Sequence, residues 1–191
     1  LTARGSRQVL VTGYPEPSLR ARRRPDATFR HPLLGLSPAG TPMPSRAEIA
    51  RGALAGRGLE LFWVDDPVEL YFLQVQGSGR LVLDDGSRVR IGYAGTNGRT
   101  YTSIGALLVK GGVFASPEQA TAPAIKAWMR AHPTEAAELA TKNERYTFFR
   151  VLPGARDEGP PGSLGAPLVP WRSVAVDPAV TPLGSVGWLS I

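Results

Sequence analysis

Glycine and proline interrupt this chain so often that long, continuous helices or strands have little room to form. The sequence contains 22 Gly and 18 Pro among 191 residues. Glycine ends regular elements through its conformational freedom, and proline ends them because its ring lacks an N–H donor. The segments between these residues are short and β-prone, so the sequence predicts a mainly β fold with several short helices rather than a helical bundle.

Composition narrows the kinds of site that this chain can hold. The chain has no cysteine and only two histidines, His31 and His132, each followed by proline. Disulfides, thiol nucleophiles and thiolate-bound zinc are therefore excluded within it, and no residue spacing indicates another metal or a cofactor. The net charge of +6 permits an anionic partner, but the basic run at residues 20–24 is predicted to be a solvated loop.

Residues 72–80, FLQVQGSGR, carry polar side chains where a core strand would carry apolar ones. In an extended strand, Gln74 and Gln76 would project side by side from the face opposite the apolar residues. Together with Ser78 they would offer the hydrogen-bond donors and acceptors that hydroxyl-rich ligands such as sugars require. The stretch is predicted to bind carbohydrate, with an exposed strand face that bonds a neighbouring loop as the alternative.

A second polar cluster follows at residues 92–105, GYAGTNGRTYTSIG. The rings of Tyr93 and Tyr101 could stack on the faces of sugars, and Asn97 could bond an N-acetyl group. Asn97 is followed by Gly98, which is equally a turn signal, so a backbone-forming role for Asn97 stays open.

Local signals predict the remaining elements. Ser45 and Glu48 form a capping box that starts a helix ending near residue 54, and residues 84–86, Asp-Asp-Gly, predict a hairpin turn. Strands are expected over residues 8–17, 59–64, 69–76, 80–83, 87–93, 146–152, 173–176 and 185–191; helices over 103–110, from 116 and from 133; and a loop or linker over 18–44 and 153–170.

Six segments of the chain occur in the order found in one known family. Their sequences are VTGYPEP (residues 11–17), PSRAEI (44–49), FLQVQGSGR (72–80), GYAGTNGRTYTSIG (92–105), NERYTFFR (143–150) and SVAVDPAVTPLG (173–184). In this order, which covers nearly the whole chain, the segments resemble the MltA family of lytic transglycosylases. The resemblance implies an incomplete double-psi β-barrel formed by residues 1–44 and 151–191, with a second, smaller β-barrel domain at residues 45–150 inserted between its parts.

The resemblance also implies a reaction. Enzymes of this family bind the glycan strands of peptidoglycan in a groove between the two domains, for cell-wall turnover. They cleave the β-1,4 bond between N-acetylmuramic acid and N-acetylglucosamine without water, leaving a 1,6-anhydro end. One Asp would act first as the general acid and then as the base. Its Asp-x-Gly-Gly-Ala-Ile segment does not occur before Ile191, so the chain is expected to be truncated and inactive.

Three further residues are carried over from the resemblance. Asp177, in VAVDP, matches an acidic position of the family, with a turn-forming role as its alternative. Glu16 lies in the Gly-Tyr-x-Glu-Pro block and, like Asp177, is expected to support catalysis rather than transfer the proton. Tyr14, in the same block, joins the predicted substrate-binding residues, although Pro15 stands where the family usually has a second tyrosine.

The resemblance implies a periplasmic monomer without cofactor or nucleic acid, attached to the outer membrane through an N-terminus that would precede Leu1. The sequence itself contains no stretch long and apolar enough to span a membrane. Two alternatives remain: a module that holds glycan strands without cutting them, and a basic β-domain that binds nucleic acid through residues 22–24.

Overall fold

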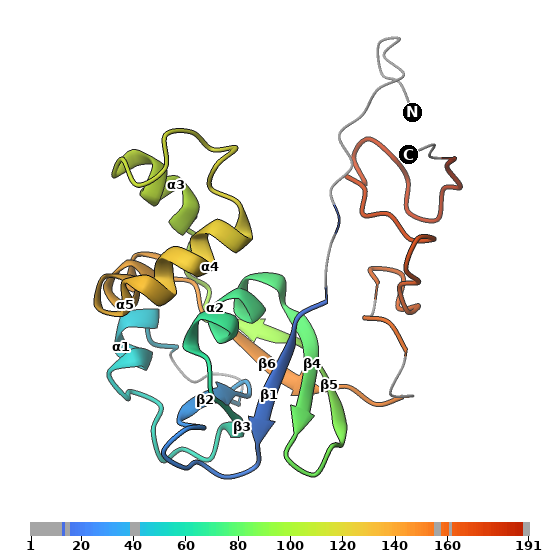
Figure 1. Cartoon of the computed structure of the whole chain (residues 1–191). Coiled ribbons are helices and arrows are strands. Elements are labelled where there is room, and N and C mark those ends of the chain that lie inside the picture. Colours follow the sequence, from blue (N-terminus) through green and yellow to red (C-terminus); the bar gives the residue numbers. More distant parts are fainter. Residues whose placement is uncertain (1–12, 14–15, 39–42, 155–157, 161, 189–191) are drawn as a thin grey trace. The chain divides into compact units, whose positions relative to one another are not determined.

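The computed structural model describes residues 13, 16–38, 43–154, 158–160 and 162–188. The chain divides into two compact units, one formed by Pro17–Pro153 and the other by Leu1–Glu16 together with Gly154–Ile191. All helices and strands found in the described residues belong to the larger unit (Figure 1).

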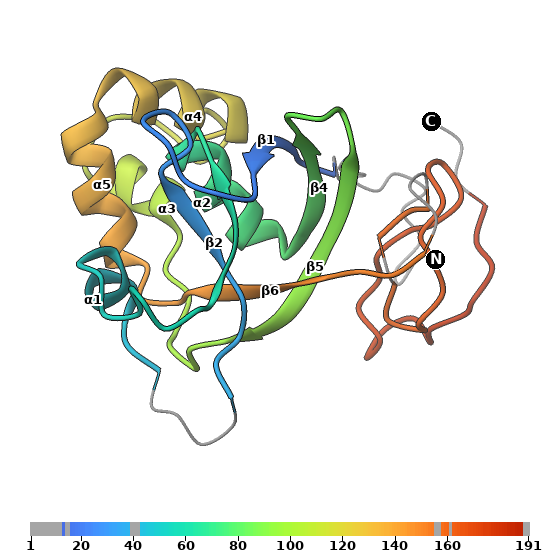
Figure 2. The same cartoon turned by 90° about the horizontal axis from the view of Figure 1, so that it is seen from below.

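A mixed sheet of six strands forms the framework of the larger unit, in the spatial order β2-β3-β1-β4-β5-β6. Strands β1 and β4 run parallel, and the other neighbouring pairs are antiparallel. Gly35, which follows β2, forms a parallel bridge with Phe149 in β6, so the two ends of the strand order meet and the sheet curls towards a barrel (Figure 2). The strands are β1 Ser18–Arg22, β2 His31–Leu34, β3 Glu60–Val64, β4 Ser78–Leu83, β5 Arg88–Thr96 and β6 Thr147–Val151.

Helix α2 connects the curled sheet to a cluster of helices. Its residues Leu70 and Leu73 are buried in the core formed with the strands, whereas Val68 and Tyr71 pack in a second core with α3, α4 and α5. Ion pairs from α4 to α2, including Lys126–Glu69 at 2.6 Å, reinforce this contact. The helices of the described residues are α1 Arg46–Ala50, α2 Pro67–Gln76, α3 Ile104–Lys110, α4 Ala122–Ala131 and α5 Pro133–Lys142.

The strand predicted over residues 69–76 is wrong, because this segment lies in α2. The Asp66 carboxylate accepts hydrogen bonds from the N–H groups of Val68 and Glu69, and Pro67 occupies the first helical position. Gly77 ends the helix with a φ of 83°. These are helix signals, and they outweigh the short alternation of polar and apolar residues. Side chains two positions apart on a helix point about 200° apart, so Gln74 and Gln76 do not project side by side.

The loop predicted over residues 18–44 is also wrong, since it contains β1 and β2. In β1, Leu19 and Ala21 point into the core between basic residues that lie at the surface. Arg20 pairs with Asp65 at 2.7 Å, and Arg22 pairs with Asp26 and Asp84. Residues 20–22 of the basic run therefore belong to a partly neutralised strand between β3 and β4, whereas Arg23 and Arg24 lie in an exposed bend after it, as predicted for a solvated loop.

Several local predictions are confirmed. The capping box is present, with the Ser45 side chain accepting from the Glu48 N–H and the Glu48 side chain accepting from the Ser45 N–H, although α1 ends at Ala50 rather than near 54. The hairpin at residues 84–86 joins β4 to β5, and the strands at 59–64 and 146–152 and the helices at 103–110 and from 133 are found within a residue or two.

The helix predicted from residue 116 begins instead at Ala122. The side chain of Thr121 accepts a hydrogen bond from the Ala124 N–H and caps this helix, whereas the Gln119 side chain accepts from the Ala115 N–H within a preceding turn. With six strands and five helices, the described residues are more helical than the mainly β fold predicted.

In the smaller unit, the described residues 158–160 and 162–188 contain no helix and none of the sheet strands. Large apolar side chains there are open to solvent, among them Trp171 and Trp188, which are 92% and 94% exposed. The strands predicted at 173–176 and in the described part of 185–191 are therefore wrong, because no neighbouring strand satisfies their backbone groups. The strand predicted at 8–17 lies almost wholly outside the described residues.

Removing the cap of α2 should weaken the larger unit, because Asp66 both accepts from two backbone N–H groups and pairs with Arg130 at 2.8 Å. We expect Asp66→Ala to lower the free energy of unfolding by about 1–2 kcal/mol in urea titrations at pH 7. Asp66→Asn keeps the capping oxygen and should lose less. Equal stability of the wild type and Asp66→Ala would contradict this account of α2.

Comparing the wild type with Asp66→Asn at different pH values tests how much the charge of Asp66 contributes to stability. Burial raises the pKa of this carboxyl, but hydrogen bonds from Arg130 and from the Glu69 and Val68 N–H groups outweigh burial and lower it below the ordinary value of 3.8. Such a carboxyl adds stability above pH 3.8, and this stability is lost as the pH falls through the lowered pKa of the folded state. The stability difference between wild type and Asp66→Asn should therefore shrink as the pH falls below 3.8, and a difference that stays constant over this range would refute the ionic contribution.

Candidate functional site

A pocket of about 390 Å³ lies where the C-terminal end of α2 meets β5 and the start of β6. Its described lining is rich in hydrogen-bonding and aromatic side chains and includes neither aspartate nor glutamate. The larger polar and aromatic members are Arg46, Arg145, Gln74, Gln76, Asn143, Tyr93 and Tyr101.

Arg46 is the buried centre of the pocket wall, with only 7% of its surface exposed. Its Nε donates to the carbonyl oxygens of Asn143 at 2.8 Å and of Arg145 at 3.1 Å, and its Nη2 donates to the Arg145 carbonyl at 2.6 Å. Its Nη1 donates to Oε1 of Gln74 at 2.5 Å. One guanidinium therefore joins α1, α2 and the segment that enters β6.

Two tyrosine rings enclose this guanidinium. The Cζ atom of Arg46 lies 4.9 Å from the centre of the Tyr71 ring and 5.1 Å from that of Tyr146. Burial lowers the pKa of Arg46, with the nearby phenols acting in the opposite direction, and burial raises the pKa of Tyr146 to about 12. At neutral pH the site therefore holds a buried cation between neutral rings, and no described carboxylate pairs with it.

Two buried asparagines fix the loops behind the pocket. Asn143 donates from Nδ2 to the Tyr71 hydroxyl at 3.0 Å, and its Oδ1 accepts from the Thr102 N–H at 3.1 Å. Asn97 donates to the carbonyls of Pro44 and Glu144 and accepts from the Tyr146 N–H at 2.9 Å. The Asn97 amide is thus engaged with the backbone, which supports its backbone-forming role over contact with an N-acetyl group.

The two predicted glutamines play different parts. Gln74 is 6% exposed, and its side chain bonds Arg46 and the hydroxyl of Tyr146. The Oε1 atom of Gln76 is buried and has no hydrogen-bond partner, although an unsatisfied buried acceptor costs about 1–3 kcal/mol. Because this atom has almost no solvent-accessible surface, a ligand in the pocket can reach it only if the Gln76 side chain rotates.

The two predicted tyrosines supply the aromatic surface of the pocket. Tyr93 in β5 is 52% exposed and Tyr101, in the segment before α3, is 45% exposed. Half-exposed rings at the edge of a polar pocket can stack on the apolar face of a ligand while their hydroxyls stay in water.

The pocket thus gathers Gln74, Gln76, Tyr93 and Tyr101, four residues that the sequence predicts to bind a ligand. Ser78 begins β4 just beyond Gly77 but is not part of the described lining.

The other predicted residues lie apart or cannot be described. Tyr14 lies outside the described residues, and Glu16 and Asp177 belong to the smaller unit. The Asp177 carboxylate accepts from the Ala179 N–H at 2.9 Å, which fits its turn-forming alternative. Their predicted supporting roles stay predictions.

Sequence reasoning missed Arg46, Asn143 and Arg145. Arg46 occupies the first position of α1, where a long basic side chain is usually solvated, yet its guanidinium is bonded to carbonyls 97 and 99 positions away. Both segments belong to blocks that resemble the family, but no local pattern indicates that they meet.

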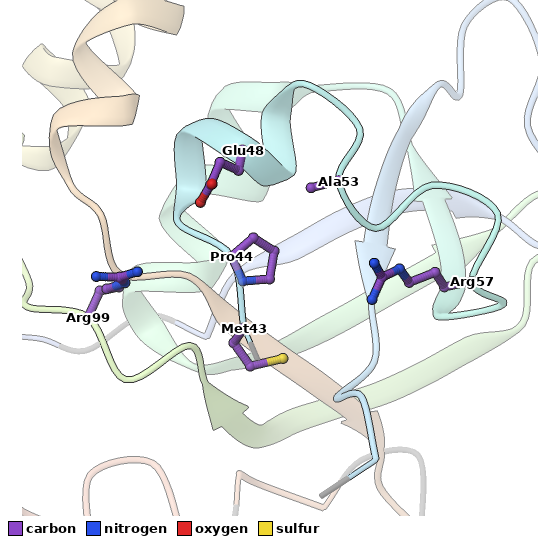
Figure 3. A pocket seen from close by; sticks show the side chains of 6 residues that line it. All are labelled: Met43, Pro44, Glu48, Ala53, Arg57 and Arg99. Atoms are coloured by element: carbon purple, nitrogen blue, oxygen red, sulfur yellow. The ribbon is translucent and has the colours of Figure 1, made fainter. Parts of the chain in front are cut away.

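A second pocket of about 320 Å³ lies beside Glu48 of α1 and holds none of the predicted residues (Figure 3). Its only described acid, Glu48, is already bonded to the N–H and hydroxyl of Ser45, and these hydrogen bonds lower its pKa. The residues that line it are Met43, Pro44, Glu48, Ala53, Arg57 and Arg99.

Among the described residues, no group of three or more His, Cys, Asp or Glu side chains is arranged to hold a metal ion. Within the same part of the chain, every helix is too short or too polar to cross a membrane.

Comparison with known proteins identifies the family. The model of the MltA specific insert domain matches residues 36–150, more than half of the chain. The membrane-bound lytic murein transglycosylase A of Vibrio cholerae is 37% identical over 179 residues, which are 93% of this chain and 48% of that protein. Its counterpart from Escherichia coli K12 is 34% identical over the same shares.

Solved structures agree with this match. The lytic transglycosylase LtgG of Burkholderia pseudomallei is 49% identical, with a TM-score of 0.73 over 91% of this chain and 52% of that one. The structure of E. coli MltA with bound chitohexaose is 33% identical, with a TM-score of 0.81 over 90% of this chain and 50% of that one.

The mixed sheet with its five helices therefore matches the fold of about half of each of these two lytic transglycosylase structures. The chain belongs to the MltA family, and it spans about half the length of the curated relatives that it matches.

If Arg46 holds the pocket wall together, replacing it with lysine should destabilise the protein. Arg46→Lys keeps the charge but cannot make the four hydrogen bonds of the planar guanidinium to its three acceptors, so buried carbonyls lose their donors. We expect the free energy of unfolding, measured in urea, to fall by about 2–4 kcal/mol. The exposed Arg88 is the matched control, and Arg88→Lys should change stability by less than about 0.5 kcal/mol. Similar losses for both variants would contradict the role of Arg46.

Proposed function

We propose that this chain forms part of the glycan-binding groove of a peptidoglycan lytic transglycosylase. The observation that carries the proposal is the grouping of Tyr93, Tyr101 and the amide side chain of Gln76 around one pocket. Sugar rings present flat C–H faces to aromatic rings and hydroxyls to amide oxygens, so this grouping suits a glycan strand. The E. coli relative whose structure contains chitohexaose supports this choice of ligand class.

The reaction proposed for the whole enzyme is non-hydrolytic. The C6 hydroxyl of N-acetylmuramic acid attacks its own C1, the β-1,4 bond to N-acetylglucosamine breaks, and the proton of the hydroxyl passes to one carboxyl after that carboxyl has protonated the leaving oxygen. Holding the hydroxyl near C1 favours it over water. The described pocket lining has no carboxyl, so we assign this pocket to binding the glycan and not to transferring the proton.

The wider setting follows from the relatives. Proteins named membrane-bound lytic murein transglycosylases act on the cell wall, and we place this protein in the bacterial envelope, as a periplasmic monomer associated with the outer membrane. The double-psi barrel and the domain bounds 1–44, 45–150 and 151–191 stay predictions. Of residues 22–24, on which the nucleic-acid alternative depends, Arg22 is paired with carboxylates, and that alternative stays a prediction.

Glycan binding can be measured by titrating the ¹⁵N-labelled chain with chitohexaose and following the amide resonances of the pocket. Tyr93→Ala, Tyr101→Ala and Gln76→Ala should each raise the Kd about fivefold, the effect of losing about 1 kcal/mol of stacking or hydrogen bonding. Tyr93→Phe keeps the ring, and Gln119→Ala removes a glutamine outside the pocket, so both should bind like the wild type.

Two results would overturn parts of this proposal. If millimolar chitohexaose leaves the pocket resonances unmoved, the pocket is not a glycan site. If the chain releases 1,6-anhydro products from purified sacculi, detected by mass spectrometry, then it carries its own proton-transfer residue and more than a binding role.

A further inference from the structure

The pocket carries a positive charge that a neutral glycan does not need. Arg46 and Arg145 both line it, and its described lining contains no acidic residue to balance them. Arg46 is almost fully buried and Arg145 is exposed. Neither forms an ion pair with a described carboxylate.

The hydrogen bonds of Arg46 leave part of its donor capacity free. A guanidinium has five N–H bonds, and Arg46 uses the one on Nε, one on Nη1 and one on Nη2. One N–H on each terminal nitrogen has no described acceptor. Paired N–H groups of a guanidinium match the two oxygens of a carboxylate, and such charge-assisted bonds are stronger than bonds between neutral groups.

The exposed guanidinium of Arg145 adds a second positive charge without disturbing the first. The Arg46 guanidinium donates to the backbone carbonyl of Arg145. It therefore lies against the same segment that carries the Arg145 side chain. Replacing the Arg145 side chain leaves that carbonyl in place, and the network around Arg46 can remain intact.

We infer that this pocket prefers a glycan that carries a carboxylate over a neutral glycan of the same length. The inference rests on the proposed glycan-binding function and names the ligand chemistry of the same pocket. A carboxylate can come from the lactyl ether on O3 of muramic acid or from a peptide attached there, because peptide attachment turns the lactyl carboxyl into a neutral amide and adds carboxyls of its own.

Four tetrasaccharides separate these sources. They are chitotetraose, an alternating N-acetylglucosamine and N-acetylmuramic acid tetrasaccharide with free lactyl carboxylates, the same compound with lactyl carboxamides, and the same compound with peptides attached. In NMR titrations of the chain in low salt, the free acid should bind about tenfold more tightly than the carboxamide. A still tighter peptide-bearing compound would assign the preference to peptide carboxylates, and the free acid as the best ligand would assign it to the lactyl group.

Variants and salt test the arginines themselves. Arg145→Gln should reduce the preference for the free acid over the carboxamide about threefold, as expected of one exposed charge. Arg88→Gln, which removes an exposed arginine outside the pocket, should leave the preference intact. Raising NaCl from 0.02 to about 0.5 M should diminish the preference, since salt screens exposed charges.

The outcomes separate the two proposals. If the chain binds all four compounds with equal affinity, the charge preference is wrong while glycan binding stands. If Arg145→Gln keeps the full preference at every salt concentration, the assignment to this pair of arginines is wrong. If the chain binds none of the compounds, the proposed glycan-binding function fails and this inference fails with it.

Discussion

The candidate site depends on the hydrogen bonds and the tyrosine-ring contacts of the Arg46 guanidinium. Removing a cation from water is costly, and here the cost is offset by carbonyl and amide acceptors and by the electron-rich faces of Tyr71 and Tyr146 rather than by a carboxylate. Because those acceptors belong to α2 and to the segment entering β6, one side chain sets how these elements meet. The pocket is therefore preformed in the fold.

Helix α2 links Arg46 to the residues that line the pocket. It is held at one end by the Asp66 cap and at the other by Gly77, and its apolar residues are buried on both the sheet and the helical side. Gln74, near its C-terminal end, is tied to Arg46. Gln76, at its last position, has an acceptor without a partner. Gln74 supports the wall through Arg46, and Gln76 lines the pocket without a bond to its buried Oε1 atom, a difference that the shared sequence pattern does not reveal.

The parts of the fold that could be predicted are those whose signals are local. The capping box at Ser45 and the Asp-Asp-Gly hairpin are determined by a few neighbouring residues and are found where expected. The strand predicted over 69–76 is wrong because a two-residue alternation is a weaker signal than the cap, the proline and the glycine that bound α2. The pairing of Arg46 with Asn143 spans 97 positions and depends on tertiary packing, so no local pattern could indicate it. The rings and amides of the pocket could be predicted because their side-chain chemistry suits a sugar. No local pattern marks Arg46 and Arg145 as pocket residues.

The solvent exchange of the Arg46 Nε–H reports whether its guanidinium is buried and hydrogen-bonded. In ¹⁵N spectra of the 191-residue chain at pH 7–8, this resonance should be distinct from those of the exposed arginines and should exchange with water much more slowly, because the Nε–H donates to the Asn143 carbonyl inside the protein. Addition of a glycan that binds the pocket should shift it. An Nε–H that exchanges as fast as that of Arg88 would show that the guanidinium is open to water, and it would contradict a pocket wall built around a buried Arg46.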